Sequence, residues 1–336
     1  MFPFLRTMFE DYEFDLERVV RWVKKGRYRT VGLQMPEGLK IRHRALAAAI
    51  EKATGALTVF VTDPCYGACD LADETMASLG IDALVHLGHS PLAGRPKVPT
   101  LFEPLHSKVP IDGVVKKAVP FLTSPVGLLT TVQHLKALDG ATKVLRAAGL
   151  AVHRSPGTRA KGQGQVLGCS YSALHSIEDK VGSFLFIGGG HFHPLGAALS
   201  TKKKVVAADP FTGTVEDMGK EREKVLRRRH GLISKARDAH SYLIIVGTKS
   251  GQRRLALARH LRRLLLERKK AVQIIAVQVI TPENLMGIDA EIFVSTACPR
   301  VALDDSMRFD RPIITPPELE IALELRSWDD YILDEF

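Results

Sequence analysis

The chain has 336 residues, 45% of them hydrophobic and 25% charged, which is typical of a globular protein of two or three domains and excludes a disordered or fibrous one. No run approaches the roughly 20 apolar residues of a membrane span, and the acidic residues of the first segment exclude a secretory signal, so we expect a cytoplasmic protein. The net charge of +10 favours an acidic or polyanionic partner, and four cysteines without signs of export favour metal or redox chemistry over disulfides.

A unit of strand, polar loop, long helix and strand occurs three times along the chain, and this order predicts parallel sheets. The first unit has predicted strands at 31–34, 57–61, 83–88 and 99–104, with a helix that ends at Ile50. The second has predicted strands at 126–131, 151–153, 183–190 and 204–210, with a helix over 132–149. The third has predicted strands at 242–248, 272–277, 291–297 and 311–316, with a long helix to Lys270 and a last helix over 317–326.

We therefore expect an α/β protein of three repeated domains, each a small, mostly parallel sheet flanked by helices. Proline-rich and charged segments near 107–112 and 211–219 are typical of boundaries. The predicted domains are residues 1–107 with Cys69, 108–210 with Cys169, and 211–336 with Cys298.

Each unit has a cysteine in the segment that follows a predicted strand: Cys69 after the second strand of its unit, Cys169 after the second and Cys298 after the third. Ligands of open parallel sheets bind beyond the carboxyl ends of the strands, so these thiols are candidates for one shared site, although any one of them could be core packing. Three thiolates suit zinc or an iron-sulfur cluster. Zinc usually takes short CxxC pairs, and the sequence has none, so the spacing favours a cluster. A cubane cluster held by three cysteines leaves one iron free to bind a substrate.

Cys65 lies four residues before Cys69, so the two would share a face if this segment were helical. The usual radical S-adenosylmethionine motif, CxxxCxxC, requires a further cysteine at the position of Ala72. A cluster in this chain must therefore recruit distant cysteines.

Four segments together resemble the archaeal catalytic subunits of diphthamide biosynthesis, the 2-(3-amino-3-carboxypropyl)histidine synthases. They are YGACDLAD around Cys69, GQVLGCSYS around Cys169, FIGGGHFHPLG from Phe186, and ACPRVALDD around Cys298. The resemblance covers almost the whole chain, including LQMPEGLK near its start and PIITPPE near its end.

The resemblance implies a three-domain homodimer in which Cys69, Cys169 and Cys298 hold one 4Fe-4S cluster per subunit. The fourth iron is expected to bind the methionine portion of S-adenosylmethionine. Reduction, by an electron donor that the sequence does not identify, then breaks the bond from sulfur to the γ-carbon and leaves methylthioadenosine. The 3-amino-3-carboxypropyl group is added to an imidazole carbon of a histidine on translation elongation factor 2.

Cys65 is not a ligand in this interpretation. The alternative is a four-cysteine cluster with no open iron, which would make the protein an electron carrier or scaffold. A zinc-stabilised protein that binds RNA through its basic helices is disfavoured, because the chain has no aromatic stacking motif, and we expect no direct nucleic-acid partner.

Further polar residues are candidates for cofactor binding, although each could also be an ordinary cap, turn or loop residue. They are Gln34, Gln133, His134, Lys249 and Gln252 in the loops of the first strands, Gly188, Gly189 and Gly190 at the end of a later strand with His193 just beyond it, and Asp209 before Pro210. Among them Lys249 is the expected partner of a cofactor carboxylate, while a GxGxxG fingerprint is absent and NAD is not inferred. Asp304 and Asp305 could start a helix, or orient the target imidazole and take its proton.

The surface predictions are two. The basic helix with Arg227, Arg228 and Arg229 is the candidate docking rim for elongation factor 2, although solvated helix faces explain such charge as well. The apolar residues near Phe2, Phe4 and Trp22 are candidate contributors to a symmetric dimer.

Overall fold

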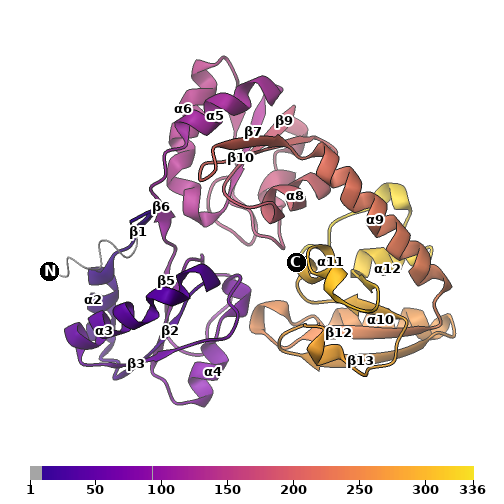
Figure 1. Cartoon of the computed structure of the whole chain (residues 1–336), viewed down its shortest axis with the longest axis horizontal. Coiled ribbons are helices and arrows are strands. Elements are labelled where there is room, and N and C mark those ends of the chain that lie inside the picture. Colours follow the sequence, from indigo (N-terminus) through magenta and orange to yellow (C-terminus); the bar gives the residue numbers. More distant parts are fainter. Residues whose placement is uncertain (1–9, 93) are drawn as a thin grey trace.

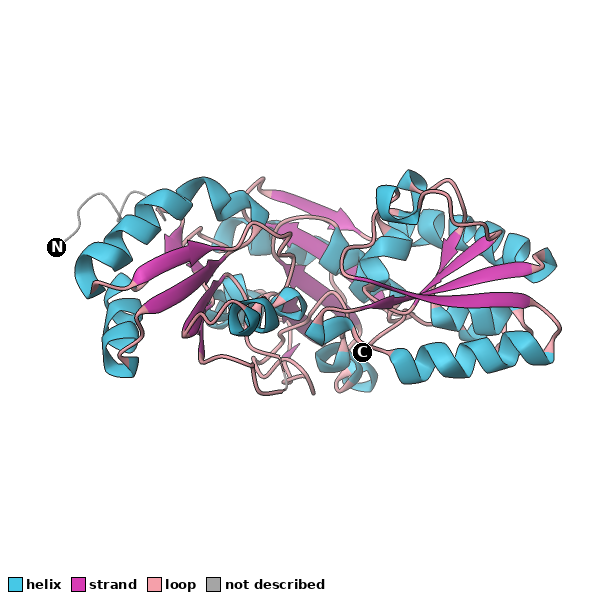
Figure 2. Cartoon of the chain, turned by 90° about the horizontal axis from the view of Figure 1, so that it is seen from below, coloured by secondary structure: helices cyan, strands magenta, loops and turns pink. Residues whose placement is uncertain are grey.

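A computed structural model describes residues 10–92 and 94–336 as three α/β units around a common centre (Figure 1). Each unit contains one sheet of four or five strands with helices packed against it, and helices lie on both sides of the magenta strands at the right of Figure 2. The predicted fold class is confirmed. None of the helices in the described ranges is long and apolar enough to cross a membrane.

The first unit has a parallel sheet of order β3-β2-β4-β5. Its strands are β2 (Thr30–Gln34), β3 (Leu57–Phe60), β4 (Ala83–Leu87) and β5 (Thr100–Glu103). Its helices are α2 (Leu16–Gly26), α3 (His43–Thr54) and α4 (Asp73–Ser78), and a short antiparallel pair joins β1 (Tyr12–Glu13) to β6 (His106–Ser107). The central strand β4 is wholly buried, as expected for an apolar strand covered on both faces.

The second unit has a sheet of order β11-β10-β9-β7-β8. Its strands are β7 (Val126–Thr130), β8 (Val152–His153), β9 (Ser183–Ile187), β10 (Lys204–Asp209) and the antiparallel β11 (Thr214–Asp217), which the sequence pattern did not predict. Its helices are α5 (Asp112–Ala118), α6 (Leu138–Ala147), α7 (Ser172–His175) and α8 (Phe192–Leu199). The helix predicted from residue 132 begins instead with a 3-10 segment, Val132–Ala137. The domain boundaries at 107 and 210 stay predictions. Strand β11 belongs to this sheet but follows residue 210 in the chain.

The third unit has a parallel sheet of order β13-β12-β14-β15. Its strands are β12 (Ser241–Gly247), β13 (Ala271–Val277), β14 (Ile292–Ser295) and β15 (Ile313–Ile314), and its helices are α9 (Gly219–Asp238), α10 (Leu255–Glu267), α11 (Pro299–Leu303) and α12 (Pro316–Ala322). The last helix ends before the predicted residue 326, because Glu324 takes a left-handed backbone with φ of 60°. Helix α9 runs from the second unit along the third (Figure 1).

Helix α9 is only in part the exposed basic face that the sequence predicts, because one of its three successive arginines is buried and a second is half-buried. Arg229 is fully buried and donates to Glu318 Oε1 at 2.7 Å and to the Ala302 carbonyl at 2.7 Å. Arg228 donates to the Leu303 carbonyl at 2.8 Å, whereas Arg227 is exposed. The docking prediction is therefore wrong for Arg229, whose charge is used inside the fold.

The predicted dimer contributors fall in two places. Phe2 and Phe4 lie outside the described residues. Trp22 is half-buried and packs against Tyr28, with 4.9 Å between the ring centroids, on the core of the first unit. Trp22 therefore has a packing role within its own unit.

Candidate functional site

One cavity of about 390 Å³ is lined by loops from all three units, and Cys69, Cys169 and Cys298 all line it. Cys69 lies in a 3-10 turn between β3 and α4, Cys169 follows β8, and Cys298 lies between β14 and α11. These loops meet because each follows a strand of a parallel sheet, where polar and ligand-binding loops gather. The three cysteines predicted to converge thus share one cavity.

Burial raises the pKa of all three thiols. The pKa of Cys298 rises to about 12. That of Cys69 lies well above its usual range because of burial and the nearby Asp70, and that of Cys169 rises despite the guanidinium of Arg159. Because burial disfavours the thiolates, these thiols are expected to be protonated unless a positive charge lies between them. A bound metal would supply that charge and stabilise the thiolates.

Side-chain N–H groups lie at long hydrogen-bond distance from two of the sulfurs. Gln252 Nε2 lies 3.6 Å from Cys69 Sγ, and Arg159 Nη1 lies 3.8 Å from Cys169 Sγ. Donors of this kind stabilise thiolates bound to a metal and tune the reduction potential of a cluster.

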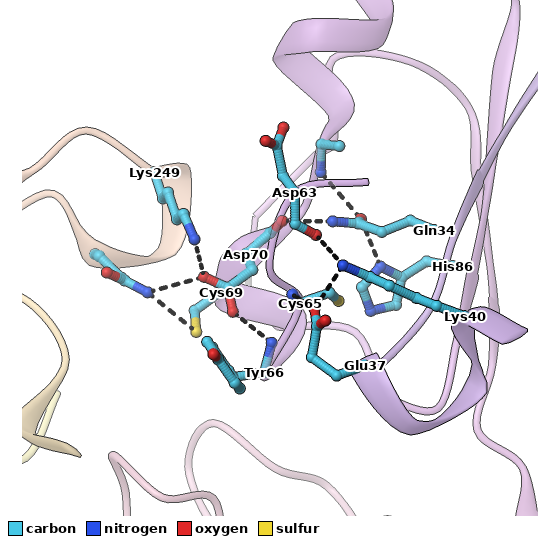
Figure 3. Close-up of polar contacts among 12 residues, drawn as sticks. Gln34, Glu37, Lys40, Asp63, Cys65, Tyr66, Cys69, Asp70, His86 and Lys249 are labelled. Carbon is cyan, nitrogen blue, oxygen red and sulfur yellow. Dashed lines mark hydrogen bonds and ion pairs between the residues drawn. The ribbon is translucent and has the colours of Figure 1, made fainter. Parts of the chain in front are cut away.

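Asp70, next to Cys69, is the centre of a polar network that joins the first and third units (Figure 3). Its Oδ1 accepts from Lys249 Nζ at 2.7 Å and from Gln252 Nε2 at 3.2 Å, and its Oδ2 accepts from the Tyr66 backbone N–H at 2.7 Å. The Asp70 carbonyl accepts from Gln34 Nε2 at 2.7 Å. Lys249 is therefore engaged by a protein carboxylate rather than free for a cofactor carboxylate.

The loop that carries Lys249 and Gln252 touches the Cys69 backbone through Gly251. A Cβ added at Gly251 would lie 2.5 Å from Cys69 Cα, closer than real atoms approach. Only glycine fits at this contact between two units.

Residues 334–336 close the cavity beside Cys169. The Phe336 N–H donates to the Cys169 carbonyl at 2.9 Å, and the Phe336 ring lines the cavity, 4.5 Å from the Arg254 guanidinium. Arg254 also donates to Asp334 at 2.7 Å. This segment ties the second unit to the third, in line with the end marked C near the centre of Figure 1.

The other predicted residues divide into two groups. Those that line the cavity with the cysteines are Gln133, His193, Lys249, Gln252 and Asp305. Those that do not line it are Gln34, His134, Gly188, Gly189, Gly190, Asp209 and Asp304.

The residues outside the cavity have local roles. Asp209 accepts from the Phe211 N–H at 2.8 Å and closes the turn before β11. Asp304 pairs with Arg300 at 3.3 Å and lines a neighbouring cavity with Gly189 and Gly190. Gln34 is buried behind the cavity wall. These residues do not line the three-cysteine cavity, and their assignment to cofactor binding or catalysis stays a prediction.

Two arginines that the sequence reasoning missed also line the cavity, Arg300 and Arg308. The Arg300 guanidinium lies 5.1 Å from the Tyr66 ring centroid and 5.4 Å from that of Phe192. Arg308 lies 3.6 Å from Asp305. Arg300 stands two residues after Cys298 within ACPRVALDD, so its position beside a predicted ligand was the available signal.

The chain is similar to known proteins over nearly its full length. Residues 35–332 match the sequence family described as "Putative diphthamide synthesis protein". The chain is 36% identical to the 2-(3-amino-3-carboxypropyl)histidine synthase of Pyrococcus horikoshii, over 96% of this chain and 94% of the relative. It is 28% identical to subunit 1 of the Mus musculus synthase, over 95% of this chain and 73% of the relative.

A solved structure has the same fold. The crystal structure of Dph2 from Pyrococcus horikoshii with a 4Fe-4S cluster superposes with a TM-score of 0.89 at 35% identity, covering 96% of this chain and 94% of that one.

Proposed function

Because the chain belongs to the diphthamide synthesis protein family and is a 2-(3-amino-3-carboxypropyl)histidine synthase with a 4Fe-4S cluster, we propose that Cys69, Cys169 and Cys298 are the cluster ligands. The observation that carries this assignment is that these cysteines, one from each unit, line a single cavity. Cys65 does not line it, which supports a cluster with three protein ligands over the four-cysteine electron carrier.

The cavity suits S-adenosylmethionine as the cosubstrate. Its volume of about 390 Å³ lies in the range of small-molecule sites. When bound, the cluster supplies the electron that breaks the bond from sulfur to the γ-carbon of the cosubstrate. We assign Arg300 and Arg308 to its carboxylate. Their own carboxylate pairs are long, at 3.3 and 3.6 Å, and partly exposed, whereas Lys249 is held at 2.7 Å by a buried carboxylate. The rings of Tyr66, Phe192 and Phe336 provide apolar walls.

The protein substrate supplies the acceptor histidine, as the name of the enzyme implies. We propose that this protein substrate is translation elongation factor 2. We also propose that the chain forms a homodimer in the cytoplasm and receives its electron from a separate donor. Asp305, which lines the cavity, is the candidate to orient the acceptor imidazole and take its proton. Asp304, outside the cavity, instead holds Arg300 in place at 3.3 Å.

Anaerobic reconstitution with iron and sulfide, followed by dithionite and S-adenosylmethionine, tests the proposed bond cleavage. Methylthioadenosine is the expected product, and with elongation factor 2 present the modified histidine should appear. The Cys169→Ala variant is the matched control and should give neither product. Deoxyadenosine as the sole nucleoside would contradict the proposed bond selectivity.

A further inference from the structure

A second group of soft ligands lies behind the wall of the cavity. Cys65 Sγ and one nitrogen each of His86 and His89 all lie within 4.8 Å of one another. Cys65 follows β3, His86 lies in β4 and His89 follows β4, so the group joins the carboxyl ends of the two strands that flank β2 in the sheet. We propose that Cys65, His86 and His89 bind one zinc-like divalent cation that is separate from the 4Fe-4S cluster.

The protonation of His86 is fixed by its neighbours. The amide of Gln34 is oriented on both sides, because its Nε2 donates to the Asp70 carbonyl at 2.7 Å and its Oε1 accepts from the Ala72 N–H at 3.1 Å. The same Oε1 lies 2.8 Å from His86 Nδ1 (Figure 3). An amide oxygen can only accept, so Nδ1 of His86 carries the proton and Nε2 presents a lone pair.

That lone pair faces the other ligands. His86 Nε2 lies 2.9 Å from His89 Nδ1. A histidine whose far nitrogen donates to a fixed oxygen while the near one is bare is the usual arrangement of a metal ligand, since the outer hydrogen bond sets the tautomer and the orientation of the ring. Gln34, predicted to contact the cofactor, thus has the position of an outer partner to His86.

The donor set and the burial favour zinc. One thiolate and two imidazoles suit zinc better than hard cations such as magnesium or calcium, which take oxygen ligands. Cys65 and His86 are almost wholly buried, at 1% and 0% exposure, whereas His89 lines the cavity. A fourth, non-protein ligand such as water therefore has access from the side of His89.

The proposed ion would hold the loop that carries Cys69. Between Cys65 and Asp70 the loop makes two hydrogen bonds across its turns, from the Tyr66 N–H to the Asp70 carboxylate at 2.7 Å and from the Asp70 N–H to the Gly67 carbonyl at 3.0 Å. The Cys65 N–H is held by a single long contact of 3.3 Å to Glu37. Bonds from Cys65 to a metal shared with β4 would fix the start of this loop and thereby the position of Cys69.

Zinc titration of the cluster-loaded protein tests the proposal, because the cluster then occupies the other three cysteines. The wild type should bind one zinc per chain in addition to its iron, measured by metal analysis after removal of free zinc. Cys65→Ser and His86→Ala should each weaken zinc binding by at least about tenfold. The control His43→Gln, whose ring lies against the Lys40 carbonyl in the same unit, should bind zinc like the wild type.

Cobalt provides a second measurement that does not depend on activity. Cobalt added in place of zinc should produce a thiolate-to-metal charge-transfer band in the wild type and not in Cys65→Ser. Absence of zinc from the wild type, or unchanged zinc in both variants, would overturn the proposal. Loss of iron in Cys65→Ser with iron retained in His86→Ala would overturn it too, and would identify Cys65 as a cluster ligand. A wild-type protein that holds both its iron and its zinc but forms no methylthioadenosine would instead count against the proposed function.

Discussion

The ammonium of Lys249 lies 2.7 Å from Oδ1 of Asp70, so a lysine of the third unit neutralises the carboxylate that directly follows Cys69 in the first. Both side chains are shielded from water, at 10% and 2% exposure. The pair therefore fastens one cysteine loop to another unit in a region of low polarity, where an unpaired carboxylate is costly.

Replacing Lys249 with glutamine should destabilise the protein by roughly 2–4 kcal/mol, because it leaves the buried Asp70 charge without a cation. The iron content after reconstitution should fall as well. Arg253→Gln is the matched control, since Arg253 also joins the third unit to the first by pairing with Glu74, but at 47% and 39% exposure. The control should cost less than about 1 kcal/mol. Chemical denaturation and iron analysis measure both variants. A Lys249→Gln variant that keeps its stability and iron but shows a raised Michaelis constant for S-adenosylmethionine would restore Lys249 as a cofactor ligand.

Alanine at Cys69, Cys169 or Cys298 should each abolish a stable cluster, because no fourth cysteine is among the described residues that line the cavity. Cys65→Ala should retain the cluster. Iron and sulfide analysis, together with the visible absorption of the reconstituted proteins, measures how much cluster each variant holds. Equal loss of iron from Cys65→Ala would favour the four-cysteine carrier.

Asp334 should make stability depend on pH in a defined window. Burial raises its pKa from 3.8 to about 6, in spite of the hydrogen bond from Arg254. The folded state therefore keeps the proton at pH values where the unfolded chain has lost it, so the contribution to stability falls as pH rises from about 4 to about 6 and is constant above. The whole effect is at most about 3 kcal/mol.

The comparison with Asp334→Asn isolates this effect. The difference in free energy of unfolding, wild type minus variant, should decrease across that window, as measured by denaturation at a series of pH values. A difference that is flat, or that increases with pH, would show that the ion pair with Arg254 outweighs burial.

The sequence predicted the three sheets and the meeting of three cysteines in one cavity, because both follow from the order of strands along the chain, while the role of these cysteines as ligands stays a prediction. Apolar strands such as Val126–Thr130 are distinct from their polar loops, and Cys69, Cys169 and Cys298 each lie in a loop that follows a parallel strand. The partner of Lys249 was out of reach, since Asp70 lies 179 residues away and meets it only when the units dock.

Arg229 is a different case, because its burial could have been predicted. It stands four residues after Val225 and four before Ile233, on the stripe that also contains Ala236, and all of these are buried. Helical spacing thus placed it on the inner face of α9. The sequence interpretation counted its charge with those of Arg227 and Arg228 and overlooked this periodicity.

Gly251→Ala should disturb the cluster although Gly251 is not a ligand. The added methyl would press on the backbone of Cys69, and relief of this clash must move one loop, at an expected cost of about 1–3 kcal/mol. Gly231→Ala is the control, because Gly231 lies within α9 with no atom near its would-be Cβ. The control should be stabilised by about 0.5–1 kcal/mol. Unchanged iron content in Gly251→Ala would show that the loops tolerate separation.

Charge changes along α9 should separate folding from docking. Arg229 has no exposure and is paired with the equally buried Glu318, so Arg229→Ala should cost about 3–5 kcal/mol by leaving that carboxylate without its cation. Arg227, by contrast, is 78% exposed and lies 3.4 Å from Glu223 on the same face, so Arg227→Glu should leave the fold intact.

If α9 contributes to the rim that meets elongation factor 2, Arg227→Glu should raise the apparent Michaelis constant for that protein, because one exposed positive charge is lost and a negative one is gained. Cleavage of S-adenosylmethionine in the absence of elongation factor 2 should be nearly unchanged. Thermal unfolding, iron content and both activities, measured on Arg227→Glu and Arg229→Ala side by side, distinguish the two roles. An Arg227→Glu variant with wild-type kinetics toward elongation factor 2 would place the docking surface elsewhere, and a loss of both activities would show that Arg227 supports the fold.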